Sequence, residues 1–267
     1  MTYRSRKSKG TAAWSSAAAR RLLALAGHQD SVEDAVRIVT SRLLEGIPCP
    51  PTDLDVLADR LDINGIVSED ILISGELRKD SRGFSIVYSS HLSASRLRFT
   101  IAHELGHAIM ERTGPNAPRS GRELERICDM FAAEILMPRT AFLEALGDTP
   151  SIRKVFELAR LFEASLIATL RRCCDLADLA AFSIENGKVG WSRGVSKNIA
   201  DEVASIMQRV LEGEWVTTNV FLGWGGVLRE WHLEGAPVGG EGNYALFLLV
   251  PLRVGPENSV KRRSTHP

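Results

Sequence analysis

The feature that most constrains this chain is residues 98–111, RFTIAHELGHAIME, where two histidines stand four residues apart with a glutamate directly after the first. On an α-helix, residues four apart lie on nearly the same face, about 6 Å apart along the axis. His103 and His107 can therefore hold one metal ion if this segment is helical. Imidazole nitrogen suits zinc, and the apolar neighbours in the segment would shelter the ion. The segment predicts a helix that carries part of a metal centre.

Glu104 and Gly106 fit the same prediction. Glu104 projects beside the metal, where a general base takes a proton from water whose pKa the metal lowers towards 7. Gly106 costs a helix interior about 1 kcal/mol relative to alanine, so we expect another element to approach this turn closely. The alternative is a pair of histidines without an ion. In a chain with six histidines, a chance His-Glu-x-x-His occurs on the order of once in a hundred chains.

A hydrolytic zinc site needs a third protein ligand and one open position. The segment GRELERICDMFAAEILMP, residues 121–138, predicts a second helix in which Glu125 and Asp129 are four apart and share a face. One of the two can bind the metal while the other accepts a hydrogen bond from a ligand histidine. Glu123 and Glu134 point elsewhere on the helical wheel, and we expect them on a solvated face.

Composition limits the classes of protein and of partner. The chain has 267 residues, 44% of them apolar, which is enough for a substantial core. Its 33 basic residues balance its 33 acidic ones, so the overall charge does not predict binding to nucleic acid or to a membrane. No apolar run approaches the 18 or so residues of a membrane span. The basic N-terminus lacks a secretory core, and the four cysteines form neither a metal knuckle nor a disulfide framework. These observations predict a cytoplasmic protein.

Periodicity and turn residues predict an α+β protein in which helices flank short strands. Helices are expected near residues 30–44 and 52–63, the second with a capping box from Thr52 to Asp55. Two or three antiparallel strands follow over 65–90, then the helices already described and one or two more up to 180. A hairpin across Asn186-Gly187, one helix near 197–213 and Gly-rich strands over 214–253 complete the pattern.

The expected domain plan has four parts. A basic, mobile leader covers 1–28, a catalytic domain 29–180, a smaller α+β region with a possible sensory role 181–255, and a basic tail 256–267. The catalytic domain is expected to be zincin-like, mostly helical with a small antiparallel sheet.

Both metal-centre segments, with the upstream TDLDVLADRLDI and GELRKDSRGFSIVYSS, resemble the ImmA/IrrE family of bacterial zinc metallo-endopeptidases over about residues 30–185. The resemblance implies zinc held by His103, His107 and Glu125, with Glu104 as base and Asp129 orienting a histidine. Many members carry a glutamate where this chain has Ile127, so Asp129 stays the second choice for the third ligand. The resemblance also implies a helix-turn-helix repressor of the XRE type as protein substrate, cleaved to relieve repression in stress or mobile-element control.

Three further residues and two other functions remain open from the sequence. Tyr88, His91 and His232 could donate a hydrogen bond to the oxyanion of peptide hydrolysis, although spacing fixes none of them. A metal-bound regulatory module could instead bind its partner without cutting it, with residues 196–253 as the sensor. A direct DNA-binding regulator is disfavoured because residues 53–69 are acidic on balance.

Overall fold

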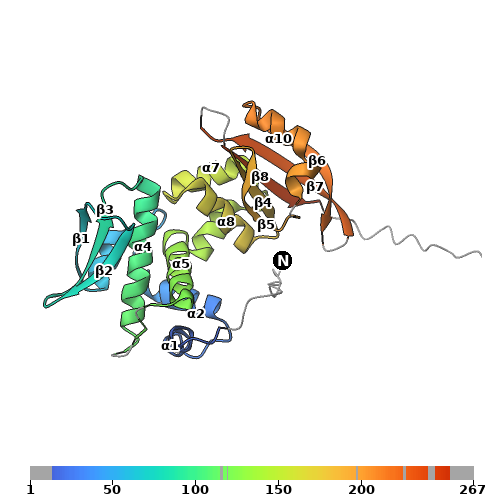
Figure 1. The fold of residues 1–267 in the computed structure, drawn as a ribbon. Coiled ribbons are helices and arrows are strands. Elements are labelled where there is room, and N and C mark those ends of the chain that lie inside the picture. The colour runs from blue at the N-terminus through green and yellow to red at the C-terminus, as the bar shows by residue number, and fades with distance from the viewer. Residues whose placement is uncertain are drawn as a thin grey trace, which may run out of the picture. The chain divides into compact units, whose positions relative to one another are not determined.

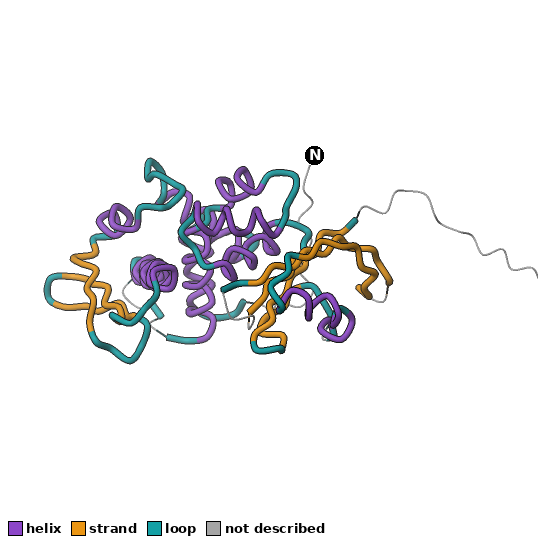
Figure 2. The backbone as a smooth tube through the Cα atoms, turned by 90° about the horizontal axis from the view of Figure 1, so that it is seen from above, coloured by secondary structure: helices purple, strands orange, loops and turns teal. Residues whose placement is uncertain are grey.

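The structure, a computed structural model, describes residues 14–114, 117–118, 120–196, 198–224, 227–239 and 244–252. It divides into two compact units. The first comprises the described residues up to Gly147 together with Phe156–Arg172, and the second comprises Asp148–Val155 and the described residues from Cys173. Each unit contains its own group of strands (Figure 2). The start of the expected leader, 1–13, and the basic tail, 256–267, lie outside the described residues.

Helices make up most of the first unit (Figure 1). In chain order they are α1 (Ala17–Leu25), α2 (Val32–Leu43), α3 (Leu54–Arg60), α4 (Ala94–Glu111), α5 (Arg122–Leu136), α6 (Arg139–Leu146), and parts of α7 (Ile152–Leu161) and α8 (Leu166–Leu176). No helix in the described part of the chain is long and apolar enough to span a membrane.

The N-terminal ends of these helices follow ordinary capping chemistry, with one difference from the expected pattern. Ser31 caps α2 through the Asp34 N–H. The capping box expected at Thr52 is absent, because the Thr52 hydroxyl donates to the Ile135 carbonyl oxygen, and Asp53 caps α3 instead. A buried interaction with another helix has replaced the local one.

α1 lies within the segment expected to be a mobile leader. Ser16 caps it by accepting the Ala19 N–H, and Ala18, Ala19 and Leu22 on one face are buried. Just before it, the Glu123 carboxylate at the start of α5 accepts the N–H groups of Ser15 and Ser16. The folded part of the chain therefore begins well before residue 29.

The small sheet of the first unit has the order β1-β3-β2, formed by β1 (Ile63–Glu69), β2 (Gly75–Asp80) and β3 (Gly83–Ser89). β2 pairs antiparallel with β3, but β1 pairs parallel with β3. The sheet is thus mixed and not wholly antiparallel. β1 lies on the side of β3 opposite to β2 and runs parallel to β3. β2 is an edge strand, and it lies beside α4 (Figure 1).

A buried ion pair fixes the far end of α5. Arg172 pairs with Glu134 and also donates to the Met137 carbonyl oxygen, while Glu134 accepts the Arg139 N–H at the start of α6. Both charged side chains are only 9% exposed. The expectation that Glu134 lies on a solvated face is therefore wrong.

The second unit is built on an antiparallel sheet of order β5-β4-β8-β7-β6. Its elements are β4 (Ala180–Glu185), β5 (Lys188–Arg193), α9 (Ile199–Glu202), α10 (Ala204–Leu211), β6 (Val216–Trp224), β7 (Val227–Pro237) and β8 (Tyr244–Pro251). Asn186 and Gly187 have positive φ, as the expected tight hairpin requires. The one helix expected here is broken at Val203, whose φ is −121°.

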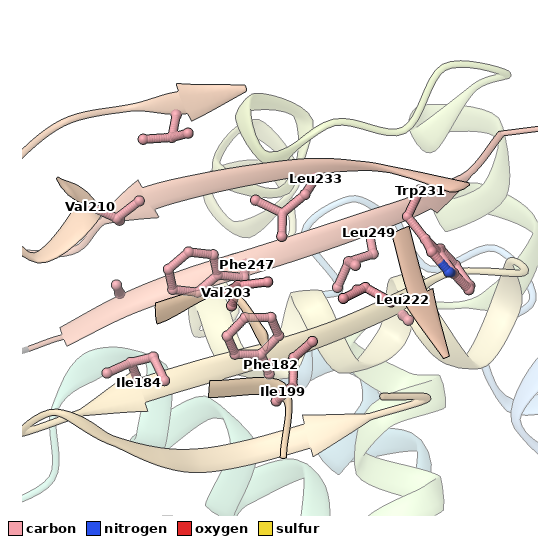
Figure 3. Packing of buried hydrophobic residues seen from close by; sticks show 13 residues of the cluster. Phe182, Ile184, Ile199, Val203, Val210, Leu222, Trp231, Leu233, Phe247 and Leu249 are labelled. Atoms are coloured by element: carbon pink, nitrogen blue, oxygen red, sulfur yellow. The ribbon is translucent and has the colours of Figure 1, made fainter. Parts of the chain in front are cut away.

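Apolar side chains from the sheet and from α9 and α10 form the core of this unit (Figure 3). Phe182 of β4 and Phe247 of β8 stack with ring centroids 4.5 Å apart. Leu233, Val203 and Val210 are also buried in this cluster. The α+β class expected from the sequence is confirmed for both units.

Candidate metal centre

α4 carries the two histidines on one face. The ring centroids of His103 and His107 are 5.0 Å apart, and both side chains are 16% exposed. This is the arrangement that four-residue spacing on a helix predicts, with two imidazoles directed to one region.

α5 supplies the two carboxylates that were singled out. The Glu125 carboxylate reaches both rings, with Oε2 3.3 Å from His103 Nε2 and Oε1 3.7 Å from His107 Nε2. Asp129 contacts a different atom, because its Oδ1 lies 2.9 Å from His103 Nδ1. Glu125 thus faces the Nε2 atoms of both histidines. Asp129 instead contacts Nδ1 of His103 and is placed to hold that ring.

Close packing of α4 on α5 explains how these side chains meet. A Cβ at Gly106 would lie 3.1 Å from the Cα of Cys128 and 3.2 Å from the Cβ of Phe131. The expectation that another element approaches Gly106 closely is confirmed. Because α5 can come this near, its carboxylates reach His103, three residues before Gly106, and His107, the residue after it.

Glu104 is buried between α4 and the edge strand β2. The Leu77 N–H donates to its carboxylate, and burial raises the pKa of Glu104 to about 7. Gly75 permits this contact, since a Cβ there would lie 2.4 Å from the Cγ2 of Thr100. The carboxyl group is therefore held in place and can exchange a proton near neutral pH.

The pKa values of the two histidines shift in opposite directions. Burial acts to lower the pKa of His103, but the hydrogen bond with Asp129 and the charges of Glu104, Asp129 and Glu125 outweigh it and raise that pKa. For His107, burial and the neighbouring His103 lower the pKa. The carboxylates around His103 give the centre the negative potential that a cation requires.

Cys128 is the other donor close to the histidines. One donor atom from each of His103, His107 and Cys128 lies within 4.8 Å of the others, so this group could hold a metal. Cys128 is fully buried, and burial raises the pKa of its thiol. The Glu125 carboxylate, by contrast, is 53% exposed. The donor set of two imidazoles and one or two acidic groups fits a divalent metal.

His103, Glu104, His107, Glu125 and Asp129 line a cleft of about 680 Å³ in the first unit. One wall comes from Ser74 and from Glu76, Leu77 and Lys79 of the following strand β2. The other wall comes from α4 and α5. The sequence reading missed Arg96, Phe99 and Thr100, which also line it. Arg96 could have been found, because it precedes His103 by seven residues and so shares its helix face.

The structure does not bring the three possible oxyanion donors into the cleft. Tyr88 lies on the inner strand β3, between Gly75 of β2 and Ser68 of β1. His91 is exposed in the loop after β3 and pairs with Asp70. His232 belongs to the second unit, where its ring lies 3.0 Å from Asn219.

Comparison with known proteins points to a metallopeptidase fold. The family model Peptidase_M78, described as the IrrE N-terminal-like domain, matches residues 67–173, which hold the whole cleft-forming pair of helices. The radiation response metalloprotease IrrE of Deinococcus radiodurans is 34% identical over 95 residues. That match spans 32% of this chain and 29% of the relative's length.

A solved structure is similar over a longer stretch. A Mycobacterium tuberculosis transcriptional regulator matches with a TM-score of 0.54 over 88% of this chain and 80% of its own, at 13% sequence identity. At this identity the likeness concerns the fold alone.

Proposed function

We propose that the protein is a zinc-dependent endopeptidase of the ImmA/IrrE type, because residues 67–173 match the IrrE N-terminal-like family model and the similar Deinococcus protein is a metalloprotease. The observation that carries the proposal is the Glu125 carboxylate, which approaches His103 Nε2 and His107 Nε2 together. His103, His107 and Glu125 would hold the zinc. When bound, zinc polarises the scissile carbonyl group and makes water a better nucleophile.

Glu104 acts as the general base and then as the general acid. It accepts a proton as the water oxygen bonds to the carbonyl carbon, and delivers a proton to the peptide nitrogen as the carbon–nitrogen bond breaks. The Leu77 N–H keeps the carboxylate aimed, and burial holds its pKa close to neutral. Asp129 fixes the His103 ring through Nδ1, so that Nε2 stays directed at Glu125.

The substrate is an extended peptide segment. Among the described strands β2 pairs only with β3, so its other edge, where the Leu77 N–H contacts Glu104, could pair with an added strand. The same strand lines the cleft and touches Glu104 through Leu77. A peptide lying against this edge would present its backbone to the catalytic residues.

We further propose that the substrate is a helix-turn-helix repressor of the XRE type, whose cleavage relieves repression. The support is the resemblance to the ImmA/IrrE family and the name of the Deinococcus relative, a radiation response metalloprotease. Such a substrate would place the enzyme in the cytoplasm, in stress or mobile-element control. A module that binds without cutting is less favoured, because it has no use for a buried carboxyl group held at the position of Glu104.

The experiment is co-expression with each helix-turn-helix repressor of the XRE type from the same genome, followed by intact mass measurement of the repressor. The control is Glu104→Gln, which should keep the metal and lose at least about 100-fold in cleavage rate. A cut made by the wild type alone supports the proposal. An intact repressor that co-purifies with both proteins would favour the binding module.

A further inference from the structure

The two ends of the cleft carry side chains of opposite charge. Arg96, His103, His107 and Glu111 follow one another on the cleft face of α4 at spacings of seven, four and four residues. Arg96 thus lies at one end of the cleft and Glu111 at the other. The Arg96 end is also the N-terminal end of α4, where the helix dipole is positive and the first turn carries no acidic residue. A positively charged side chain at the positive end of a helix does not stabilise that helix. Helix stability therefore does not account for Arg96, and we look for its role in the cleft.

Neighbouring arginines are engaged, whereas Arg96 is not. Arg78 pairs with Glu69 and Glu76, and Arg98 pairs with Glu163 and donates to the Thr52 carbonyl oxygen. Among the residues that the structure describes, Arg96 has no carboxylate partner, and its guanidinium contacts only the Ser74 hydroxyl, at 3.4 Å. Its side chain is exposed to the cleft.

The contacts of β2 with α4 place Arg96 relative to the reaction. Ser74 lies against Arg96, Gly75 against Thr100, and Leu77 against Glu104, so strand and helix advance in the same direction. Arg96 precedes His103 by seven residues, which is about 10 Å along the helix axis. An extended peptide covers that distance in about three residues.

From these observations, and resting on the peptidase function proposed above, we propose that Arg96 is a specificity-determining residue. It binds an acidic side chain of the substrate about three residues from the scissile bond, on one side of that bond only. Guanidinium is suited to this task because it binds a carboxylate through two parallel hydrogen bonds. For a solvent-exposed pair, we expect a preference of about three- to fivefold over a neutral residue.

The test uses the full-length, zinc-loaded protein and a peptide mixture made by cutting a bacterial proteome after lysine. Mass spectrometry of the products gives the residue frequencies around each cut. The variants are Arg96→Gln and Arg96→Glu, and the matched control is Arg82→Glu, an 84% exposed arginine in the β2–β3 turn outside the cleft. The wild type and the control should favour Asp or Glu at one position two to four residues from the cut. Arg96→Gln should lose this preference, and Arg96→Glu should favour arginine there.

Two results would overturn the role of Arg96 and leave the peptidase function intact: cuts without any acidic preference at these positions, or a preference that survives in Arg96→Glu. If the wild type cuts nothing, the peptidase proposal fails. The role of Arg96 in binding acidic peptides is then tested by peptide retention. Immobilised Glu104→Gln protein should then retain peptides about threefold richer in Asp and Glu than the Glu104→Gln, Arg96→Glu double variant does. Equal composition of the two eluates would refute the inference.

Discussion

At the scale of single residues, Glu125 and Asp129 are one helical turn apart and yet contact different atoms of the same imidazole. Removal of Glu125 takes away the group that faces both histidines, whereas removal of Asp129 only releases the His103 ring. We therefore expect Asp129→Ala to lower zinc affinity by about 10- to 100-fold and Glu125→Ala to lower it further.

Competition with a chromophoric zinc chelator measures both affinities. Cys128→Ala is the control, because the buried thiol with its raised pKa is a poor metal ligand, and this variant should stay within about twofold of the wild type. A larger loss in Asp129→Ala than in Glu125→Ala would exchange their roles, and a large loss in Cys128→Ala would make the thiol a ligand.

At the scale of elements, the closeness of α4 and α5 depends on Gly106. An alanine there gains about 1 kcal/mol of helix propensity, but its methyl group meets the backbone of α5 at 3.1 Å, which cannot yield as a flexible side chain would. We expect Gly106→Ala to lower the free energy of unfolding by about 1–3 kcal/mol and to weaken zinc binding, because α5 carries Glu125.

Urea denaturation and the chelator competition test this prediction. Gly65→Ala is the matched control, since its Cβ would meet only the Val67 side chain at an ordinary 3.8 Å. An unchanged free energy of unfolding and an unchanged zinc affinity in Gly106→Ala would show that α4 and α5 can move apart without loss of stability or of the metal centre.

The attachment of the segment before α1 to α5 is predicted to weaken in acid. Hydrogen bonds from Ser16 and Ser15 lower the pKa of the Glu123 carboxyl group. A lowered pKa in the folded state means that the contact stabilises above the usual titration range of glutamate and is lost as the pH falls through the lowered value.

Hydrogen exchange of residues 14–25, compared at each pH between the wild type and Glu123→Gln, reports this loss. The wild type should be better protected at neutral pH, and the difference should vanish in acid, because the neutral amide mimics the protonated carboxyl group. A difference that is independent of pH would show that the charge of Glu123 plays no part.

Local patterns made some elements predictable and left others hidden. The helices that carry the metal centre and the Asn186-Gly187 hairpin follow from periodicity and turn chemistry, which act between near neighbours in the chain. The parallel pairing of β1, the Asp53 cap and the burial of Glu134 do not, because each depends on a partner far away in sequence: β3, Ile135 and Arg172 respectively. Arg96 was not singled out from the sequence, because its proposed role depends on which face of α4 lines the cleft.

At the scale of the whole molecule, the division into units does not follow the sequence order that periodicity suggests. The chain leaves the first unit at Gly147, joins the second over Asp148–Val155, returns to the first over Phe156–Arg172, and then stays in the second. A boundary at residue 180 is the natural reading of a sequence in which helices give way to strands. α7 crosses between units without any break in its helical pattern, so no local signal marks the crossing.

This crossing predicts the behaviour of a fragment that ends at residue 180. The Ile152 N–H donates to Glu234 Oε2 at 2.7 Å, and the Arg153 guanidinium lies 5.1 Å from the centre of the Trp215 ring. Without residues 181–267, these groups lose their partners. We expect fast hydrogen exchange over 152–155 and a lower melting temperature than in the full chain. The full-length Glu234→Gln variant is the control, since it weakens one hydrogen bond at a cost of about 1 kcal/mol. If the fragment matched the full chain in both measurements, the first turn of α7 would not need the rest of the second unit. The boundary near 180 would then be a true limit of independent folding.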